Sequence, residues 1–143
     1  MQPSFASITI SYLIHSTEDE ALLNSMVLSA FDLSSSEISV SNVEGHFGNK
    51  LILVKAHLVG ERAQDVASKI SAIFSDSARA QISENIEKSM DEHDALFLRL
   101  DRQSLDRAFN LNDEEPIKIK LKPKFRRSRS EMIRSYLEMI REK

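Results

Sequence analysis

The segment IKIKLK, residues 117–122, alternates strictly between an apolar and a basic side chain. Successive side chains of a β-strand point to opposite faces of a sheet, so this pattern predicts a strand with one buried and one solvated face. The segment SITISYLIHS, residues 7–16, alternates in a similar way. Strands that are buried on one face only are typical of antiparallel sheets. The two segments therefore restrict the chain to folds built on a sheet that is covered on one side.

Between these segments, helical and extended patterns follow one another without a regular repeat. Apolar residues at helical spacing predict a helix over residues 18–31, and Thr17 with Glu20 predicts a capping box at its start. Residues 37–43 and 50–59 predict a hairpin, and residues 95–103 a further strand. Residues 61–90 predict two helices, with a break at Ser75 and Asp76 because both are good N-cap residues.

The resulting order is β-α-β-β-α(α)-β-β-α, which indicates the α+β class: a five-stranded, largely antiparallel sheet with helices packed on one face. We expect residues 1–125 to form a single domain. Residues 126–143 are expected to form a basic linker and an amphipathic helix, with Ser128 and Glu131 as a second capping box.

Composition excludes several classes of protein. The chain has 143 residues and no cysteine, which rules out disulfides and thiolate chemistry. No apolar run approaches the ~20 residues of a membrane span, so we expect a soluble, cytoplasmic protein without a membrane partner. Catalytic motifs are absent, and the histidines lack metal-ligand spacing. Glu44 and His46 are candidates for an acid and a base, but nothing supplies a nucleophile, so we expect no enzyme, no cofactor and no metal.

Charge is divided unevenly along the chain. Residues 1–115 carry 9 Lys and Arg against 19 Asp and Glu, whereas residues 116–143 carry 10 against 3. The positive potential is therefore concentrated near the carboxyl terminus, where the strand alternates lysine with isoleucine or leucine. A row of lysines on a solvated strand has roughly the spacing of neighbouring phosphates, which predicts RNA binding. The candidate residues are Lys118, Lys120, Lys122, Lys124, Arg126, Arg127 and Arg129.

Two other roles for these basic residues stay open. Lysines on an edge strand prevent edge-to-edge aggregation. Alternatively, the basic segment neutralises the acidic remainder of the chain.

The hairpin turn EGHFGN, residues 44–49, contains a glutamate, a histidine and a phenylalanine that a simple connection between two strands does not require. Our hypothesis is that the backbone N–H groups of Gly45 and Gly48 contact RNA and that His46 or Phe47 stacks on a base, with Asn49 completing the site. One alternative is that the glycines and Asn49 adopt positive φ and that Phe47 folds back onto the core, which we favour slightly for Phe47. Another is that Glu44 and Asn49 hydrogen-bond the segment LRLDRQ and lock the fold.

The carboxyl-terminal helix has an apolar stripe formed by Met132, Ile133, Tyr136, Leu137 and Ile140. An isolated helix of ~15 residues is marginal in water, so this stripe must cover some apolar surface. Its own domain, a second copy of the chain and a foreign partner are the three choices. The core looks complete without it, so the pattern favours a homodimer; a protein–protein adaptor is the alternative function to RNA binding.

Several segments resemble those of an archaeal family described as RNA-binding proteins or predicted exosome subunits. VEGHFGNKLILVKAHL resembles its E-G-H-[FYH]-G-N-P-I segment, and ITISYLIHSTEDEALL its first strand and helix start. ALFLRLDRQSLDRAFNL resembles its L-R-x-D-K-Q segment, with Arg102 in place of the usual lysine, and Lys50 stands where proline is usual. The resemblance covers residues 5–123. It implies a curved mixed sheet similar to a ribosomal 5S-RNA-binding protein, RNA contact at Arg102, and an accessory role in an exosome-type RNA-processing complex.

Overall fold

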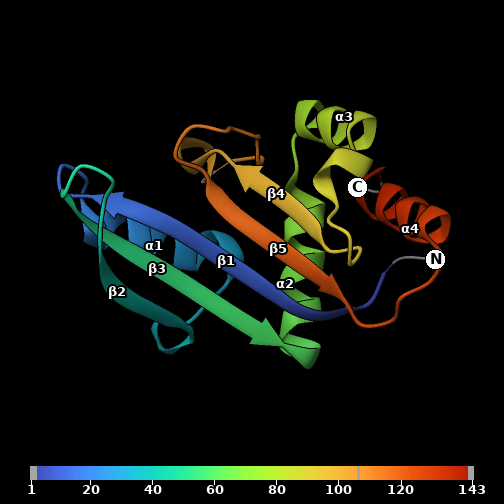
Figure 1. Ribbon diagram of the computed structural model, residues 1–143, viewed down its shortest axis with the longest axis horizontal. Coiled ribbons are helices and arrows are strands. Elements are labelled where there is room, and N and C mark those ends of the chain that lie inside the picture. Colours follow the sequence, from blue (N-terminus) through green and yellow to red (C-terminus); the bar gives the residue numbers. More distant parts are fainter. Residues whose placement is uncertain (1–2, 106, 142–143) are drawn as a thin grey trace.

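The structure is a computed structural model that describes residues 3–105 and 107–141. Within these residues, five antiparallel strands form one sheet in the order β2, β3, β1, β5, β4, with β1 at its centre (Figure 1). The strands are β1 Phe5–His15, β2 Ile38–Glu44, β3 Lys50–Val59, β4 Leu96–Leu100 and β5 Ile117–Pro123. Each begins and ends within a few residues of the segment predicted from its pattern.

Helices cover only one face of this sheet. The described helices are α1 Glu20–Phe31, α2 Gly60–Ile73, α3 Asp76–Glu84 and α4 Arg129–Arg141. In Figure 1, α1 and α2 cross behind the sheet, α3 lies above β4, and α4 packs against α3 on the side of the amino terminus. The predicted α+β class, with a sheet that is covered on one side, is therefore confirmed.

Of the three helix N-caps predicted from the sequence, those at Ser75 and Ser128 are confirmed and the one at Thr17 is wrong. Ser75 caps α3 by accepting a hydrogen bond from the backbone N–H of Ala78 at 3.1 Å, as its position after α2 predicts. Ser128 accepts from the backbone N–H of Glu131 at 3.3 Å at the start of α4. The box predicted at Thr17 is wrong, because α1 begins at Glu20 and Asp19 is its N-cap.

Alternation along the strands determines which side chains enter the core. On β5, Ile117, Ile119 and Leu121 are buried, and the lysines between them are exposed. On β1, Ile8, Ile10 and Ile14 are buried against the helices in the same way. The sheet thus contributes one apolar face to the core and leaves the other to solvent.

The carboxyl-terminal helix packs into this same core. Tyr136 and Ile140 are fully buried, and the Tyr136 ring stacks on Phe5 with 6.3 Å between centroids. The expectation that the core is complete without this helix is therefore wrong. α1 and α2 leave the Phe5 end of the sheet and one side of α3 uncovered, and α4 covers both. Residues 142–143 of the predicted helix lie outside the described residues.

Homodimer formation was predicted from the apolar stripe of α4, and that stripe is used inside the protein. A dimer remains a prediction that analytical ultracentrifugation tests, but it now requires a different surface. No helix in the described part of the chain is both long and apolar enough to cross a membrane.

An ion pair joins α2 to the turn before β2, and it predicts how the stability of the protein depends on pH. Arg62 donates to Glu37 at 2.8 Å; this hydrogen bond, followed by one from the backbone N–H of Ser34, lowers the pKa of Glu37 from 4.5 to about 2. A depressed carboxyl pKa contributes stability above the unfolded pKa, and this contribution is lost as the pH falls through the folded value. We therefore expect Arg62→Gln to destabilise the protein at neutral pH, with a difference from wild type that shrinks between about pH 4.5 and pH 2. Urea unfolding at a series of pH values measures this; a difference that is constant with pH would contradict the assignment.

Candidate nucleic-acid interface

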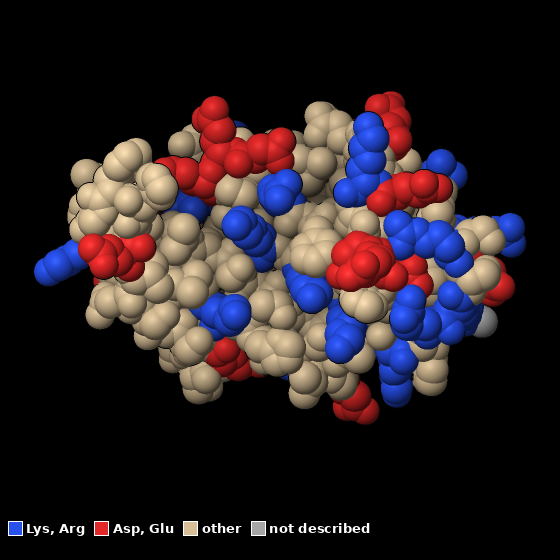
Figure 2. Space-filling view, in the orientation of Figure 1, with Lys and Arg blue, Asp and Glu red and all other residues tan. Residues whose placement is uncertain are grey.

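The face of the sheet opposite α1 and α2 is exposed, and we call it the open face. Figure 2 looks onto this face and shows basic residues along its middle and a second group at the end near α4. The basic side chains that the strands place on the open face are Lys55 of β3, Arg99 of β4, and Lys118, Lys120 and Lys122 of β5, all of them exposed. The predicted solvent-facing lysine row of β5 is therefore present as part of a wider basic surface.

Strand register aligns these cations across the sheet. Ser11 on the central strand lies between Lys55 on one side and Lys118 on the other, and Lys118 faces Arg99 on β4. Neighbouring strands are ~4.8 Å apart, and successive residues on one face of a strand are ~6.6 Å apart. The open face thus presents a two-dimensional array of cations, along β5 and across it, rather than a single line.

The position of β5 decides one of the open alternatives. β5 pairs with β1 on one side and with β4 on the other, so it is not an edge strand. Its backbone N–H and C=O groups are occupied by neighbours, and its lysines have no edge to protect. Protection against edge-to-edge aggregation therefore does not explain these lysines.

An aromatic side chain lies within the basic array. Phe97 of β4 is 42% exposed, and the Nζ atom of Lys120 lies 5.5 Å from its ring centroid. In the same row across the sheet, the hydroxyl of Thr9 is 2.9 Å from Nδ1 of His57. Sheet surfaces that bind single-stranded RNA use such exposed rings as stacking platforms between cations.

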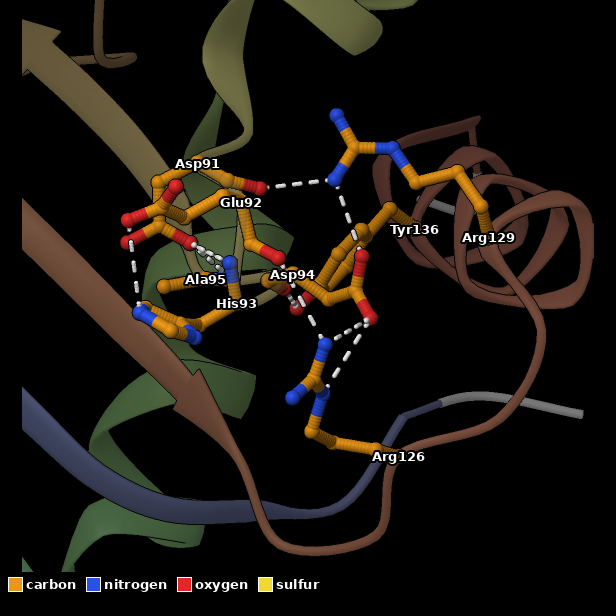
Figure 3. A network of polar contacts seen from close by, with 8 residues as sticks. All are labelled: Asp91, Glu92, His93, Asp94, Ala95, Arg126, Arg129 and Tyr136. Carbon is orange, nitrogen blue, oxygen red and sulfur yellow. Dashed lines mark hydrogen bonds and ion pairs between the residues drawn. The ribbon is translucent and has the colours of Figure 1, made fainter.

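Two of the predicted RNA-binding arginines are engaged within the protein (Figure 3). Asp94 is only 4% exposed, and it accepts from Arg129 at 2.9 Å and from Arg126 at 3.4 Å. Arg129 also donates to the backbone carbonyl of Asp91 at 2.7 Å. These arginines therefore hold the start of α4 and the chain before it against the loop before β4, which is the neutralising role left open from the sequence.

The same network anchors α4. The hydroxyl of Tyr136 donates to the backbone carbonyl of Asp94 at 2.6 Å, and burial raises the pKa of this phenol well above its usual value. Asp94 itself has a left-handed backbone conformation with φ of 65°, and its carboxylate points toward the two arginines. Lys124 and Arg127 are exposed beyond the end of β5 and remain candidates for RNA contact.

The EGHFGN turn forms a closed loop at the tip of the β2–β3 hairpin. The N–H of Gly45 donates to the carbonyl of Asn49 at 2.7 Å, and the N–H of Gly48 donates to the carbonyl of Gly45 at 3.0 Å. Neither amide is a free donor for RNA, so the hypothesis of amide contact is wrong in that form. Gly48 has the expected positive φ, of 78°, whereas at Gly45 a Cβ would lie only 2.2 Å from Oδ1 of Asn49.

Phe47 projects from the tip of this turn. Its side chain is 92% exposed, and its ring meets His46 edge-on with 4.9 Å between centroids. The expectation that Phe47 folds back onto the core is therefore wrong, because the hairpin tip extends past the core residues of β3. Among the described residues, no hydrogen bond joins Glu44 or Asn49 to residues 98–103, so the locking alternative is also unsupported.

Arg102 lies at the end of the sheet that also carries the hairpin tip. Its side chain is only 10% exposed; Nη1 donates to both carboxylate oxygens of Glu18 at 2.8 and 3.1 Å, and Nε donates to the backbone carbonyl of Glu115 at 2.7 Å. Burial opposes ionisation of Glu18, but the hydrogen bond from His15 and the charge of Arg102 outweigh it and lower its pKa. RNA contact at Arg102 stays a prediction, and it is restricted to the part of the guanidinium that Glu18 and Glu115 leave free.

His15, Glu18 and Glu115 have ligand atoms within 4.8 Å of one another, close enough to hold a metal ion. However, Nε2 of His15 is 2.7 Å from the Glu115 carboxylate, and Glu18 is already paired with Arg102. A cation would have to displace both partners, so we interpret the trio as an ion-pair network.

Sequence reasoning missed Lys55, Phe97 and Arg99 as members of the open face. Each alternates with buried residues, as LFLRL does over β4, so the signal for exposure was present. What the pattern lacks is which strands are neighbours, because the pairing of β4 with β5 joins residues about twenty positions apart.

An antiparallel sheet with helices on one face and a basic, aromatic-bearing opposite face defines an α+β protein with a sheet surface open to a ligand. Residues 7–123 match the family model described as RNA binding, and the chain therefore belongs to this RNA-binding family.

Three solved structures of archaeal proteins are similar to this chain. A DUF54 protein of Archaeoglobus fulgidus is similar with a TM-score of 0.79 and 24% identity, covering 95% of this chain and 99% of that one. A DUF54 protein of Methanothermobacter thermautotrophicus has a TM-score of 0.76 and 21% identity, and the match covers 95% of this chain and 98% of that one. A DUF54 protein of Sulfolobus solfataricus has a TM-score of 0.71 and 24% identity, and the match covers 92% of this chain and 97% of that one. No curated protein matches the chain significantly. These TM-scores, over almost the whole of each chain, show that the fold is shared.

Proposed function

We propose that the protein is a non-catalytic RNA-binding protein that holds a single-stranded segment of RNA on the open face. The observation that carries the proposal is the alignment of five exposed cations on β3, β5 and β4 of the open face, with an exposed phenylalanine among them. Cations on β3, β4 and β5 attract the phosphates, and Phe97 offers a base a surface on which to stack. Membership of the RNA-binding family supports the same function.

Direct binding tests this proposal. Fluorescence anisotropy with labelled single-stranded RNA, over a range of salt concentrations, should show binding whose affinity falls as salt rises. Three to five phosphate contacts correspond to a slope of about −2 to −3.5 in log K against log salt, at ~0.7 per contact for a single strand. Absence of binding at the lowest salt, or affinity independent of salt, would contradict the proposal.

The hairpin tip is a second place for a base to stack. Phe47→Ala should leave the free energy of unfolding within ~0.5 kcal/mol of wild type, because the ring is almost fully exposed. If a base stacks on this ring, affinity for RNA should fall by 1–3 kcal/mol, roughly fivefold to 150-fold. Urea unfolding and anisotropy on the same samples separate the two effects. Unchanged RNA affinity would remove the hairpin tip from the interface.

We propose further that this binding serves, in the cytoplasm, an RNA-processing or RNA-degrading complex of the exosome type, with this protein as an accessory. The support is family membership and the segments that resemble the predicted exosome-subunit family. An accessory should change the rate at which a purified exosome-type complex degrades RNA without degrading RNA alone. Degradation by the isolated protein, or no effect and no co-sedimentation with the complex, would contradict this role. The adaptor alternative requires the apolar side of α4, which is occupied within the protein.

A further inference from the structure

The two edge strands of the sheet, β2 and β4, differ in how their outer sides are covered (Figure 1). On the outer side of β4, Leu111 forms a β-bridge with Leu100. The N–H of Asn112 donates to the carbonyl of Arg99 of the same strand at 3.1 Å. No hydrogen bond from another part of the described chain reaches the outer side of residues 38–43, and residues 39–42 are exposed. β2 is therefore the open edge of the sheet.

β2 also lacks the features that normally protect an edge strand. It contains no lysine, arginine or proline, and its one charged residue, Glu44, lies at its end. It pairs with β3 in continuous register from Ile38 to Glu44, without a bulge. The side chain of Val40, in the middle of the strand, is 51% exposed. An edge of this kind is a ready template for pairing with another strand.

The turn that closes the β2–β3 hairpin determines which backbone groups of β2 point outward. The N–H of Gly45 donates to the carbonyl of Asn49 at 2.7 Å. Along an antiparallel pair, residues that bond to the neighbouring strand alternate with residues that do not. Counting back from Gly45, the odd-numbered residues of β2 bond to β3, so the N–H and C=O groups of Val40 and Asn42 point outward.

These outward groups match those of a second β2 related by a two-fold axis through Ser41. Antiparallel pairing about this axis sets Ser41 opposite Ser41, and Val40 opposite Asn42 of the second copy, so each strand donates to and accepts from the other. All three side chains are uncharged. The Lys55 side chains of the two open faces would be at least three strand spacings apart, about 14 Å, which exceeds the screening length of ~10 Å at 0.1 M salt. The edge is therefore complementary to itself.

We propose that β2 is a dimer interface, to which a second copy of the chain adds its own β2 in antiparallel register centred on Ser41. This inference does not depend on the proposed RNA binding. The assembly stops at two chains, because the pairing uses the open edge of both copies and leaves only the covered edges at β4. A two-fold axis perpendicular to the sheet keeps both open faces on the same side, so the dimer carries both basic arrays on one continuous sheet.

Sedimentation equilibrium of the full chain tests the dimer. The dimer should predominate at about 0.5 mM and dissociate on dilution, because an interface of this small size belongs to the weak class. Asn42→Pro removes an outward N–H at a position where an edge strand tolerates proline, and Val40→Lys adds a charge to the edge. Each variant should raise the dissociation constant at least about tenfold, and urea unfolding verifies that the fold is retained. Val59→Lys is the matched control, because Val59 is 61% exposed on β3, outside β2, and should keep wild-type dimerisation.

A cysteine cross-link tests the register, because the chain has no cysteine of its own. In the proposed dimer the Cα atoms of Ser41 in the two copies are ~4.5 Å apart, within the range that a disulfide spans. Ser39 is an exposed serine of the same strand, and its Cα lies ~14 Å from that of its counterpart, out of reach of a disulfide. Mild oxidation should therefore give a covalent dimer of Ser41→Cys and leave the matched variant Ser39→Cys uncross-linked.

Several results would overturn this interface. A monomer at every concentration would do so, as would a dimer that Asn42→Pro or Val40→Lys leaves at wild-type strength. Equal weakening by Val59→Lys would show that the effect is not local to β2. Cross-linking at Ser39 as efficient as at Ser41 would show random collision or another register. None of these results bears on RNA binding by the open face, which is measured separately.

Discussion

Replacing Tyr136 with alanine should lower the free energy of unfolding by about 3–5 kcal/mol, as for other large buried aromatic residues. The side chain is fully buried, stacks on Phe5 and donates a hydrogen bond to the carbonyl of Asp94. Alanine leaves a cavity between α4 and the sheet and an unsatisfied carbonyl at Asp94. Domains of this size have only 5–15 kcal/mol of stability, so the loss should be large in urea or thermal unfolding.

Tyr136→Phe is the matched control, because it keeps the ring and removes only the hydroxyl. It should cost about 1–2 kcal/mol, the usual range for a hydrogen bond whose buried acceptor loses its donor. Wild-type stability in both variants would show that α4 is not packed on this domain in solution. In that case the apolar stripe would be available for a second copy of the chain, and sedimentation of the intact protein should show a dimer.

Changing Lys118, Lys120 and Lys122 together to glutamine should weaken binding of single-stranded RNA by about a hundredfold at 0.1 M salt. Each lost phosphate contact removes ~0.7 from the slope of log K against log salt, so three contacts remove about 2. The fold should be retained, because these side chains project from the solvated face of β5 while Ile117, Ile119 and Leu121 stay buried.

A variant with the same change of charge elsewhere separates local contact from the net field. Lys88, Arg134 and Arg141 are exposed and lie outside the sheet, on the short helical turn Glu87–Ser89 and on α4. Changing these three to glutamine should leave the salt slope within about half a unit of wild type. Equal losses of affinity in the two triple variants would show that net charge, and not the open face, attracts the RNA.

Local patterns in the sequence were sufficient to predict which elements form and which side of each is buried. Strict alternation over β5 predicted both the buried apolar row that begins at Ile117 and the exposed lysines, because one face of the strand meets the core and the other meets water. Ser75 predicted the break between α2 and α3, because a helix N-terminus needs a side-chain acceptor for its unpaired N–H groups. Such signals depend only on residues within a few positions of one another.

Tertiary structure decided which of these elements are neighbours, and with that what each charged or apolar side chain does. β5 pairs with β1 across more than a hundred residues of chain, which makes it an interior strand and sets Lys118 between Ser11 and Arg99. Asp94 binds Arg126 and Arg129 from a segment more than thirty residues away, so basic residues that look alike in the sequence divide into those that anchor the chain and those that lie on the open face. The stripe of α4 finds its cover on Phe5 and α3 for the same reason. A local pattern indicates that a side chain needs apolar cover or an opposite charge, whereas only the long-range packing of the chain determines which residue provides it.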